Sequence, residues 1–180
     1  MIKKWFVFAV AVMLAGSAFA AEKESSGVTP NLDKGTKVLE GAGSINMMAE
    51  EVQLQLAYGQ FVADRIEVAL VAGLRDNDFY MSTELGVRAE YNLVLDSALV
   101  PFLGAGVVWA SAEADDSDID TDAAVFSVGG GVKYFIRDDV ALAVNASYLV
   151  VTDDLFVDAE DGEVEDSDIR FLFSVRFYFD

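Results

Sequence analysis

The 180-residue chain contains neither cysteine nor histidine. Without cysteine there is no disulfide, no thiolate metal site and no thiol nucleophile. Without histidine there is no serine–histidine pair and no imidazole ligand for zinc. These two absences remove most hydrolase mechanisms. The sequence predicts no enzyme activity and no catalytic, cofactor-binding or metal-ligating residue.

Basic residues are also scarce, because 12 lysines and arginines face 31 acidic residues and the net charge is −19. Nucleic acid is therefore not an expected partner, since phosphate binding needs a basic patch. Yet 53% of the residues are hydrophobic, an unusual share for so acidic a chain. The charges must therefore be segregated from the apolar surface.

The chain also lacks a long apolar run, because its apolar stretch near the N-terminus is short. Lys3 and Lys4 precede the apolar stretch 5–14, and Ala18-Phe19-Ala20 is a small-x-small cleavage site. The alternative, a transmembrane helix, needs roughly 20 apolar residues. We therefore expect a cleaved signal peptide over residues 1–20. Residues 21–35 are polar and predict a flexible periplasmic leader with no core to join, followed by one domain over 36–180.

Strict alternation dominates the rest of the chain, most clearly in its last segment. From Ile169 to Phe179 the odd positions are all apolar, whereas the even positions include Arg170 and Arg176. Because successive side chains of a strand point to opposite faces, this segment has an apolar face and a polar face. Such a strand is typical of a wall between lipid and a polar lumen.

Eight alternating segments are present in all. They span residues 36–47, 50–59, 66–75, 79–92, 98–110, 124–136, 140–152 and 168–179. Their lengths match the roughly 9–11 residues that a tilted strand needs to cross a bilayer. Strands can span a bilayer only as a closed barrel, because an open edge would leave backbone groups unpaired in hydrocarbon. The prediction is an all-β fold: an eight-stranded antiparallel transmembrane β-barrel with up-and-down meander order, closed by the last segment against the first.

The connections alternate between short turns and longer loops. Three short ones, 58–65, 91–97 and 134–139, share a tyrosine start and an aspartate near the end, which predicts one recurrent tight turn. Two long loops, 111–123 and 153–168, carry 15 of the 31 acidic residues. Short periplasmic turns and longer extracellular loops are the asymmetry of an outer-membrane barrel, with both termini on the turn side.

The parity of each segment also predicts which side chains enter the lumen. The small ones are Ala57, Gly59, Gly73, Gly86, Gly104, Gly106, Gly129, Gly131, Ala143, Ser147 and Ser174. The polar or charged ones are Glu40, Glu51, Gln53, Gln55, Glu67, Arg75, Glu84, Arg88, Glu90, Lys133, Asn145, Arg170 and Arg176. Since both signs are present, we expect salt bridges that plug a narrow lumen. The outward aromatics Tyr58, Tyr91, Tyr134, Phe177 and Phe179 predict one membrane girdle, with Trp109 and Tyr148 in the opposite half.

The acidic loop beginning at Asp116 has the D-x-D-x-D start of an EF-hand. Position six is Thr121 instead of glycine, and position twelve is Ser127 instead of glutamate, so a dedicated calcium site is not predicted. A solvated loop is favoured, and loose bridging of divalent cations between these carboxylates and anionic lipid headgroups stays open. Gly129-Gly130-Gly131 lies inside an alternating segment and is not a phosphate loop.

Four stretches of the chain are distinctive: VGGGVKYFIRDDVAL (128–142), YGQFVADRIEV (58–68), PFLGAG (101–106) and the aromatic final strand. In these stretches the chain resembles the small outer-membrane β-barrel family of the OmpA-barrel and OmpX type. The resemblance covers residues 36–180. Its motifs are typical of the fold and do not indicate one particular activity. It implies contact with outer-membrane lipid and lipopolysaccharide, and insertion by the barrel-assembly machinery, which recognises a terminal aromatic. Here Phe179 is penultimate, before Asp180. Proteins of the OmpA type also carry a peptidoglycan-binding domain after the barrel, and we do not expect that function here because the resemblance covers the barrel alone.

Three roles follow from this fold. The favoured one is a non-catalytic protein of the cell outer membrane with a structural or surface-interaction role. The first alternative is a porin-like channel for small solutes. The second is a soluble lipocalin-like ligand binder, which would need an apolar lumen and a polar exterior.

Overall fold

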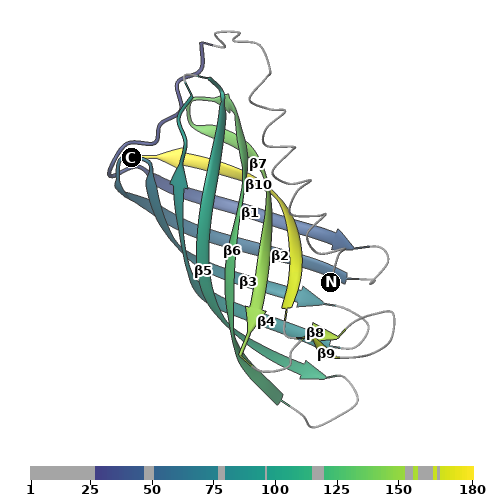
Figure 1. Ribbon diagram of the computed structural model, residues 1–180. Helices are drawn as coiled ribbons and strands as arrows, with labels where there is room; N and C mark the ends of the chain where they lie inside the picture. The colour runs from purple at the N-terminus through teal and green to yellow at the C-terminus, as the bar shows by residue number, and fades with distance from the viewer. Residues whose placement is uncertain are drawn as a thin grey trace.

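The computed structural model describes residues 27–46, 51–76, 80–95, 97–114, 120–152, 156–157, 164–165 and 167–180. Eight long strands form one closed antiparallel sheet in the order β1-β10-β7-β6-β5-β4-β3-β2 (Figure 1). They are β1 (Lys37–Asn46), β2 (Glu51–Ala63), β3 (Ile66–Asp76), β4 (Tyr80–Asn92), β5 (Leu99–Ala114), β6 (Asp120–Arg137), β7 (Val140–Val151) and β10 (Ser167–Phe179). The predicted eight-stranded meander is confirmed. Within the described residues, no helix is long and apolar enough to cross a membrane.

Side chains alternate between the two faces of this sheet as the sequence predicts. In β3 every second residue is buried along the whole strand. The outward residues are large and apolar, and Leu56 and Leu85 are 66% and 68% exposed. The inward residues include Glu40, Glu67, Glu90, Lys133 and Arg176, which are buried. This distribution is the reverse of the one that a soluble lipocalin-like barrel needs.

The ends of several strands differ from the prediction. The loop expected over 111–123 is largely strand, because β5 and β6 continue as a paired hairpin as far as Glu113 opposite Asp120. Backbone pairing continues beyond the apolar band because it does not depend on whether the side chains are apolar. Within the loop expected over 153–168, a small ladder pairs β8 (Phe156–Val157) with β9 (Val164–Glu165).

The three short connections are not one recurrent turn. The β2–β3 and β6–β7 connections are two-residue turns, at Asp64-Arg65 and Asp138-Asp139. In both, a register shift lies just before the turn, at Phe61/Ala63 and at Phe135/Arg137. The β4–β5 connection instead runs over residues 93–98. A tyrosine and an aspartate at similar spacing therefore do not distinguish a bulged tight turn from a longer loop.

We call the end of the barrel with these three connections the turn end and the opposite end the loop end. Residues 27–36 and the C-terminus both lie at the turn end (Figure 1). The closing ladder joins β1 to β10 there, beginning with Lys37 opposite Phe179. The predicted closure of the last segment against the first is confirmed.

Residues 27–35 do not behave as the predicted leader with no core to join. Leu32 is 3% exposed and packs in one apolar cluster with Val38, Phe61, Ala98, Val100, Phe135, Ala141 and Tyr178. Leu32 is flanked by polar residues in the sequence, and its burial becomes visible only once the turn end is assembled around it. The predicted domain limits and signal peptide stay predictions, since residues 1–26 lie outside the described part of the chain.

Candidate functional site: the barrel lumen

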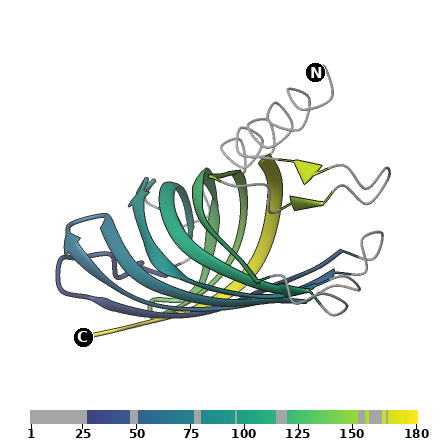
Figure 2. The same ribbon diagram turned by 90° about the horizontal axis from the view of Figure 1, so that it is seen from below.

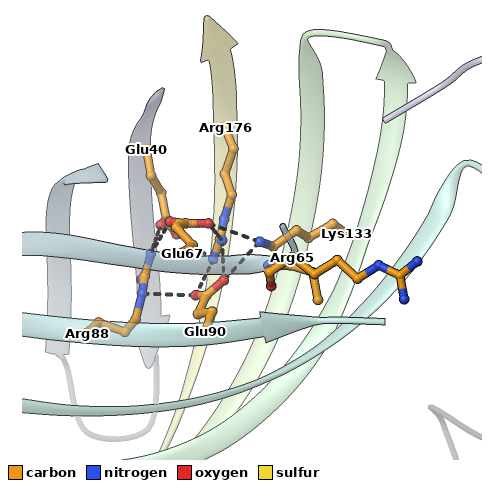
Figure 3. A network of polar contacts seen from close by, with 8 residues as sticks. Glu40, Arg65, Glu67, Arg88, Glu90, Lys133 and Arg176 are labelled. Carbon is orange, nitrogen blue, oxygen red and sulfur yellow. Dashed lines mark hydrogen bonds and ion pairs between the residues drawn. The ribbon is translucent and has the colours of Figure 1, made fainter. Parts of the chain in front are cut away.

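The centre of the lumen holds a cluster of three carboxylates and three cations. Glu40 comes from β1, Glu67 from β3 and Glu90 from β4, whereas the cations are Arg88, Lys133 and Arg176 from β4, β6 and β10 (Figure 3). Each lies on the inward parity of its strand, as predicted. Because the numbers of positive and negative groups are equal, the central cluster can be buried without an uncompensated charge.

Arg176 is the most connected member of the central cluster. Its Nη1 lies 2.7 Å from Glu90 Oε2 and its Nη2 lies 3.0 Å from Glu90 Oε1, a bidentate pair. Its Nη2 also lies 3.2 Å from Glu40 Oε1, and its Nη1 lies 3.7 Å from Glu67 Oε2. The whole residue is 0% exposed. One side chain from the closing strand therefore ties β10 to β1, β3 and β4 across the lumen.

The other two cations complete the cluster. Lys133 Nζ lies 2.9 Å from Glu90 Oε2 and 3.3 Å from Glu67 Oε2. Arg88 Nε lies 2.9 Å from Glu90 Oε1, and its Nη2 donates a short hydrogen bond to Glu40. Every carboxylate is thus held by at least two cations. Such carboxylates are fixed in place by their partners, which suits a structural network more than acid–base catalysis.

Phe102 is the member of this layer that sequence reasoning missed. Its ring lies 4.9 Å from Lys133 Nζ and 5.0 Å from Arg176 Cζ, so two of the cations pack over it. Gly131 faces the same ring, and a Cβ added there would lie 2.9 Å from Phe102 Cζ. The available signal was parity, because Phe102 shares the inward parity of Gly104 and Gly106. Its apolar side chain set it apart from the small, polar and charged residues expected in the lumen.

A second polar layer lies nearer the loop end. Arg170 of β10 makes a bidentate pair with Glu84 of β4, at 3.1 Å and 2.9 Å. Arg75 of β3 lies 3.5 Å from Asp168 of β10. The predicted inward direction of both arginines is confirmed. The side chain of Glu51, also predicted to be inward, lies outside the described residues.

The turn end of the lumen is apolar, which the sequence analysis did not predict. Tyr178 packs against Phe135 and Phe61 with tilted rings, whose centroids lie 5.0 Å and 6.4 Å away. Leu32 covers this apolar cluster, and the carbonyl of Leu32 accepts a hydrogen bond from the Arg65 amide at 3.0 Å. We call residues 27–36 the cap. The lumen is therefore filled at two heights, by charges at its centre and by apolar side chains under the cap.

Several hydrogen bonds fasten the cap to the turns of the barrel. Gly35 N donates to Phe61 O at 2.8 Å, and Phe61 N donates to Thr36 O at 2.8 Å. Thr29 N donates to Asp138 Oδ1 at 2.7 Å, and Lys34 N donates to Asp64 Oδ1 at 3.1 Å. Arg65 has a positive φ of 69°, an uncommon conformation for a residue other than glycine. Its amide and carbonyl are both bonded, to Leu32 and to Asn92, which stabilises that turn.

Among the described residues, the acidic loops form no metal-binding site. Asp116 and Asp118 of the EF-hand-like pattern lie outside the described residues, and Asp120 begins β6. Among the described residues, no group of three or more acidic side chains is arranged to hold a metal ion. Gly129 to Gly131 lies within β6, as expected for glycines of a strand.

The outward aromatics lie where parity places them. Tyr58, Tyr91, Tyr134, Phe177 and Phe179 are exposed on the outer face toward the turn end, and Trp109 and Tyr148 are exposed nearer the loop end. Tyr58 and Phe179 are neighbours across the closing strands, with ring centroids 6.4 Å apart. Their amphipathic or apolar rings suit the two edges of a hydrocarbon layer.

Solved structures of similar fold are small outer-membrane barrels. The N-terminal β-barrel domain of Pseudomonas aeruginosa OprF aligns with a TM-score of 0.63 at 16% identity, covering 81% of this chain and 98% of that one. Neisserial surface protein A (NspA) gives 0.58 at 18% identity, covering 80% and 95%. The outer membrane protein OprG from Pseudomonas aeruginosa gives 0.55 at 11% identity, covering 84% and 99%. At these identities the likeness concerns the fold.

No curated protein matches the sequence. The outer membrane protein beta-barrel domain family, by contrast, matches residues 6–177, nearly the whole chain. That family agrees with the closed eight-stranded sheet, the apolar exterior and the charged lumen. The chain belongs to the outer membrane protein beta-barrel domain family and is a protein of the outer membrane.

Proposed function

We propose that this protein is a non-catalytic, non-conducting barrel with a structural or surface-interaction role in the outer membrane. The observation that carries the proposal is the central cluster, in which three carboxylates and three cations fill the lumen between β1, β3, β4, β6 and β10. Lys133 and Arg176 are both 0% exposed, so little water reaches the middle of the barrel. The cap and the apolar layer beneath it add a second obstruction.

Conductance of planar lipid bilayers tests this proposal against the alternative of a small-solute channel. Protein whose insertion has been verified by protease protection should leave the bilayer silent, because ions would have to cross two packed layers. Steady unitary currents would contradict the plugged lumen and favour the porin-like alternative.

The absence of histidine and cysteine supports a role without catalysis. Glu84 and Glu90, two carboxylates on the inner face of β4, are both engaged with arginines. We therefore expect substitution of either residue to change the stability of the protein only, because the protein itself should have no lipid-modifying activity. Conversion of lipopolysaccharide or phospholipid by the purified protein, followed by mass spectrometry, would contradict this.

The proposed partners are lipopolysaccharide and outer-membrane lipid, the barrel-assembly machinery during insertion, and loosely held divalent cations at the acidic loops. Loops of like charge repel an anionic leaflet unless cations intervene. A chelator should therefore increase protease cleavage in loop 153–168 of the protein in lipopolysaccharide vesicles. Unchanged cleavage would count against cation bridging.

Export through a cleaved signal peptide predicts that the purified protein begins at Ala21, which N-terminal sequencing checks.

A further inference from the structure

The closing seam of the barrel is shorter than the strands that form it. β1 and β10 pair from Lys37 opposite Phe179 only as far as Gly43 opposite Phe173. β10 continues to Ser167 along β7, and β1 continues to Asn46 along β2. Figures 1 and 2 show the two strands side by side at the C-terminus and diverging toward the loop end. Among the described residues, these loop-end halves have no backbone pairing with each other.

A hollow lies at the point where the pairing stops. It has a volume of about 410 Å³ and is lined by Gly43, Ser44, Val52, Gln53, Leu54 and Phe173. Its outer lining is apolar, because Val52, Leu54 and Phe173 point away from the lumen, while Gly43 has no side chain to fill the space. This volume falls within the roughly 300–1,000 Å³ of small-molecule sites.

The inner lining of the hollow is polar. Gln53 is buried, yet neither its amide nitrogen nor its amide oxygen has a hydrogen-bond partner in the described part of the chain. A buried amide without partners is costly, so an occupant that supplies them would be stabilised. Gln53 also lies opposite Arg75 in the β2–β3 ladder, so the guanidinium group that pairs with Asp168 is its neighbour on the inner face. The inner side therefore favours a polar head with acceptor oxygens and a negative charge.

The loop-end half of β10 is held by side chains instead of by β1. The Arg170–Glu84 and Arg75–Asp168 pairs reach from it to β4 and β3 across the lumen. These ion pairs keep the barrel together on the inside, and the outer side of the seam stays open to the surrounding membrane.

We propose that this seam binds a long-chain carboxylic acid from the surrounding membrane. The alkyl chain lies over Gly43 between Leu54 and Phe173, and the carboxylate enters the seam to accept a hydrogen bond from the Gln53 amide. An added β-strand would pair with the backbone edge of β10, but it would leave the inward-facing amide of Gln53 without a partner. The chemistry of the hollow therefore favours an amphiphile over a peptide or a second copy of the chain.

Photolabelling in lipid nanodiscs tests the site with a long-chain fatty acid that carries a diazirine on its chain. Peptide mapping should find label concentrated on Val52, Leu54 and Phe173. Gly43→Leu fills the hollow and should lower that labelling roughly tenfold, equivalent to about 1.4 kcal/mol. Gln53→Leu should weaken labelling by the acid more than labelling by its methyl ester, because only the acid presents a charged head.

Gly41→Leu is the control, because it adds the same bulk on the same face of β1, two residues nearer the turn end. A Cβ at Gly43 would lie 3.1 Å from the backbone oxygen of Gln53, so the Gly43 variant is the tighter of the two. A Cβ at Gly41 would lie 4.0 Å from Leu56 Cδ2, so the substitution has room. Labelling in this variant should be unchanged, with circular dichroism confirming the fold of every variant. Even labelling around the barrel that Gly43→Leu leaves unaltered would mean annular lipid only and would overturn the proposal. A dimer captured at the seam by a separate bifunctional protein cross-linker, with no labelling at the hollow, would show a second copy of the chain there and would overturn it as well.

Engineered cysteine pairs test the opening itself, because the chain has no cysteine of its own. Ala42→Cys with Ser174→Cys joins register partners in the paired half of the seam. Ser44→Cys with Leu172→Cys lies two residues further, where continued pairing would place the same kind of neighbours. The first pair should form a disulfide on oxidation and the second should not. Equal disulfide formation in both would show a closed seam and refute the site, without bearing on whether the lumen conducts.

Discussion

At the scale of single residues, Arg176 should contribute more to stability than any exposed charge. It is fully buried and contacts Glu40, Glu67 and Glu90. Arg176→Met keeps much of the side-chain volume but leaves three carboxylates with two cations. Because a broken buried pair leaves an uncompensated charge, we expect the free energy of unfolding to fall by about 3–5 kcal/mol. Urea unfolding in lipid vesicles, followed by tryptophan fluorescence, measures it.

Arg137→Met is the matched control for this prediction. Arg137 also pairs with an acid, since its Nε lies 3.0 Å from Asp139 Oδ1, but the two side chains are 71% and 50% exposed. An exposed pair contributes only about 0–1 kcal/mol. Equal losses in the two variants would contradict a stabilising role for the central cluster.

The direction of these residues could be read from the sequence, but their partners could not. Period-two alternation places Glu67, Arg88 and Lys133 in the lumen because a shift of one residue would expose charge to lipid. Which acid meets which base depends on how far each strand is staggered around the barrel. Glu84 and Arg170, for example, are 86 residues apart in the chain. Phe102 was missed because alternation identifies the inward face without saying that an apolar ring belongs there.

At the scale of elements, the cap should hold the turn end together through Leu32. Leu32→Ala removes a buried side chain from the cluster with Phe61, Phe135 and Tyr178. We expect the free energy of unfolding to fall by about 2–5 kcal/mol, as for other buried leucines. Hydrogen exchange at the Arg65 amide, which donates to Leu32 O, should become faster.

The control for the cap is Leu95→Ala in the β4–β5 connection at the same end of the barrel. Leu95 is exposed, so its truncation should change stability by less than about 0.5 kcal/mol. If Leu32→Ala is equally mild and the Arg65 amide exchanges as before, the cap is not fastened as the structure shows.

Strand identity was predictable because each strand carries its own alternation, but the ends of the strands were not. The β5–β6 hairpin continues through acidic residues such as Asp122, which faces Ser111, because both faces of a hairpin beyond the membrane can be polar. The cap shows the converse case. A segment of polar composition has no periodicity of its own, and Leu32 is buried only because β2, β6 and β10 bring Phe61, Phe135 and Tyr178 together at one end.

At the scale of the whole molecule, the apolar exterior and the charged interior explain how a chain with a net charge of −19 can be embedded in a membrane. The charged side chains of the central cluster are buried in the lumen, whereas the outer face offers lipid the side chains of Leu56, Leu70 and Leu85. About half of the acidic residues, 15 of 31, fall in 111–123 and 153–168, the end of the β5–β6 hairpin and the connection that precedes β10. This separation gives the molecule two chemically different ends, and it therefore predicts an orientation.

Because outer-membrane barrels place short turns in the periplasm, the loop end should face the cell exterior. Asp122→Cys, near the loop end, should react with a membrane-impermeant maleimide on intact cells. Arg137→Cys, at the turn end, should react only after the outer membrane has been permeabilised. Both positions are exposed, and the chain has no other cysteine to give background. Labelling of Arg137→Cys but not Asp122→Cys on intact cells would invert the proposed orientation and place the acidic loops in the periplasm.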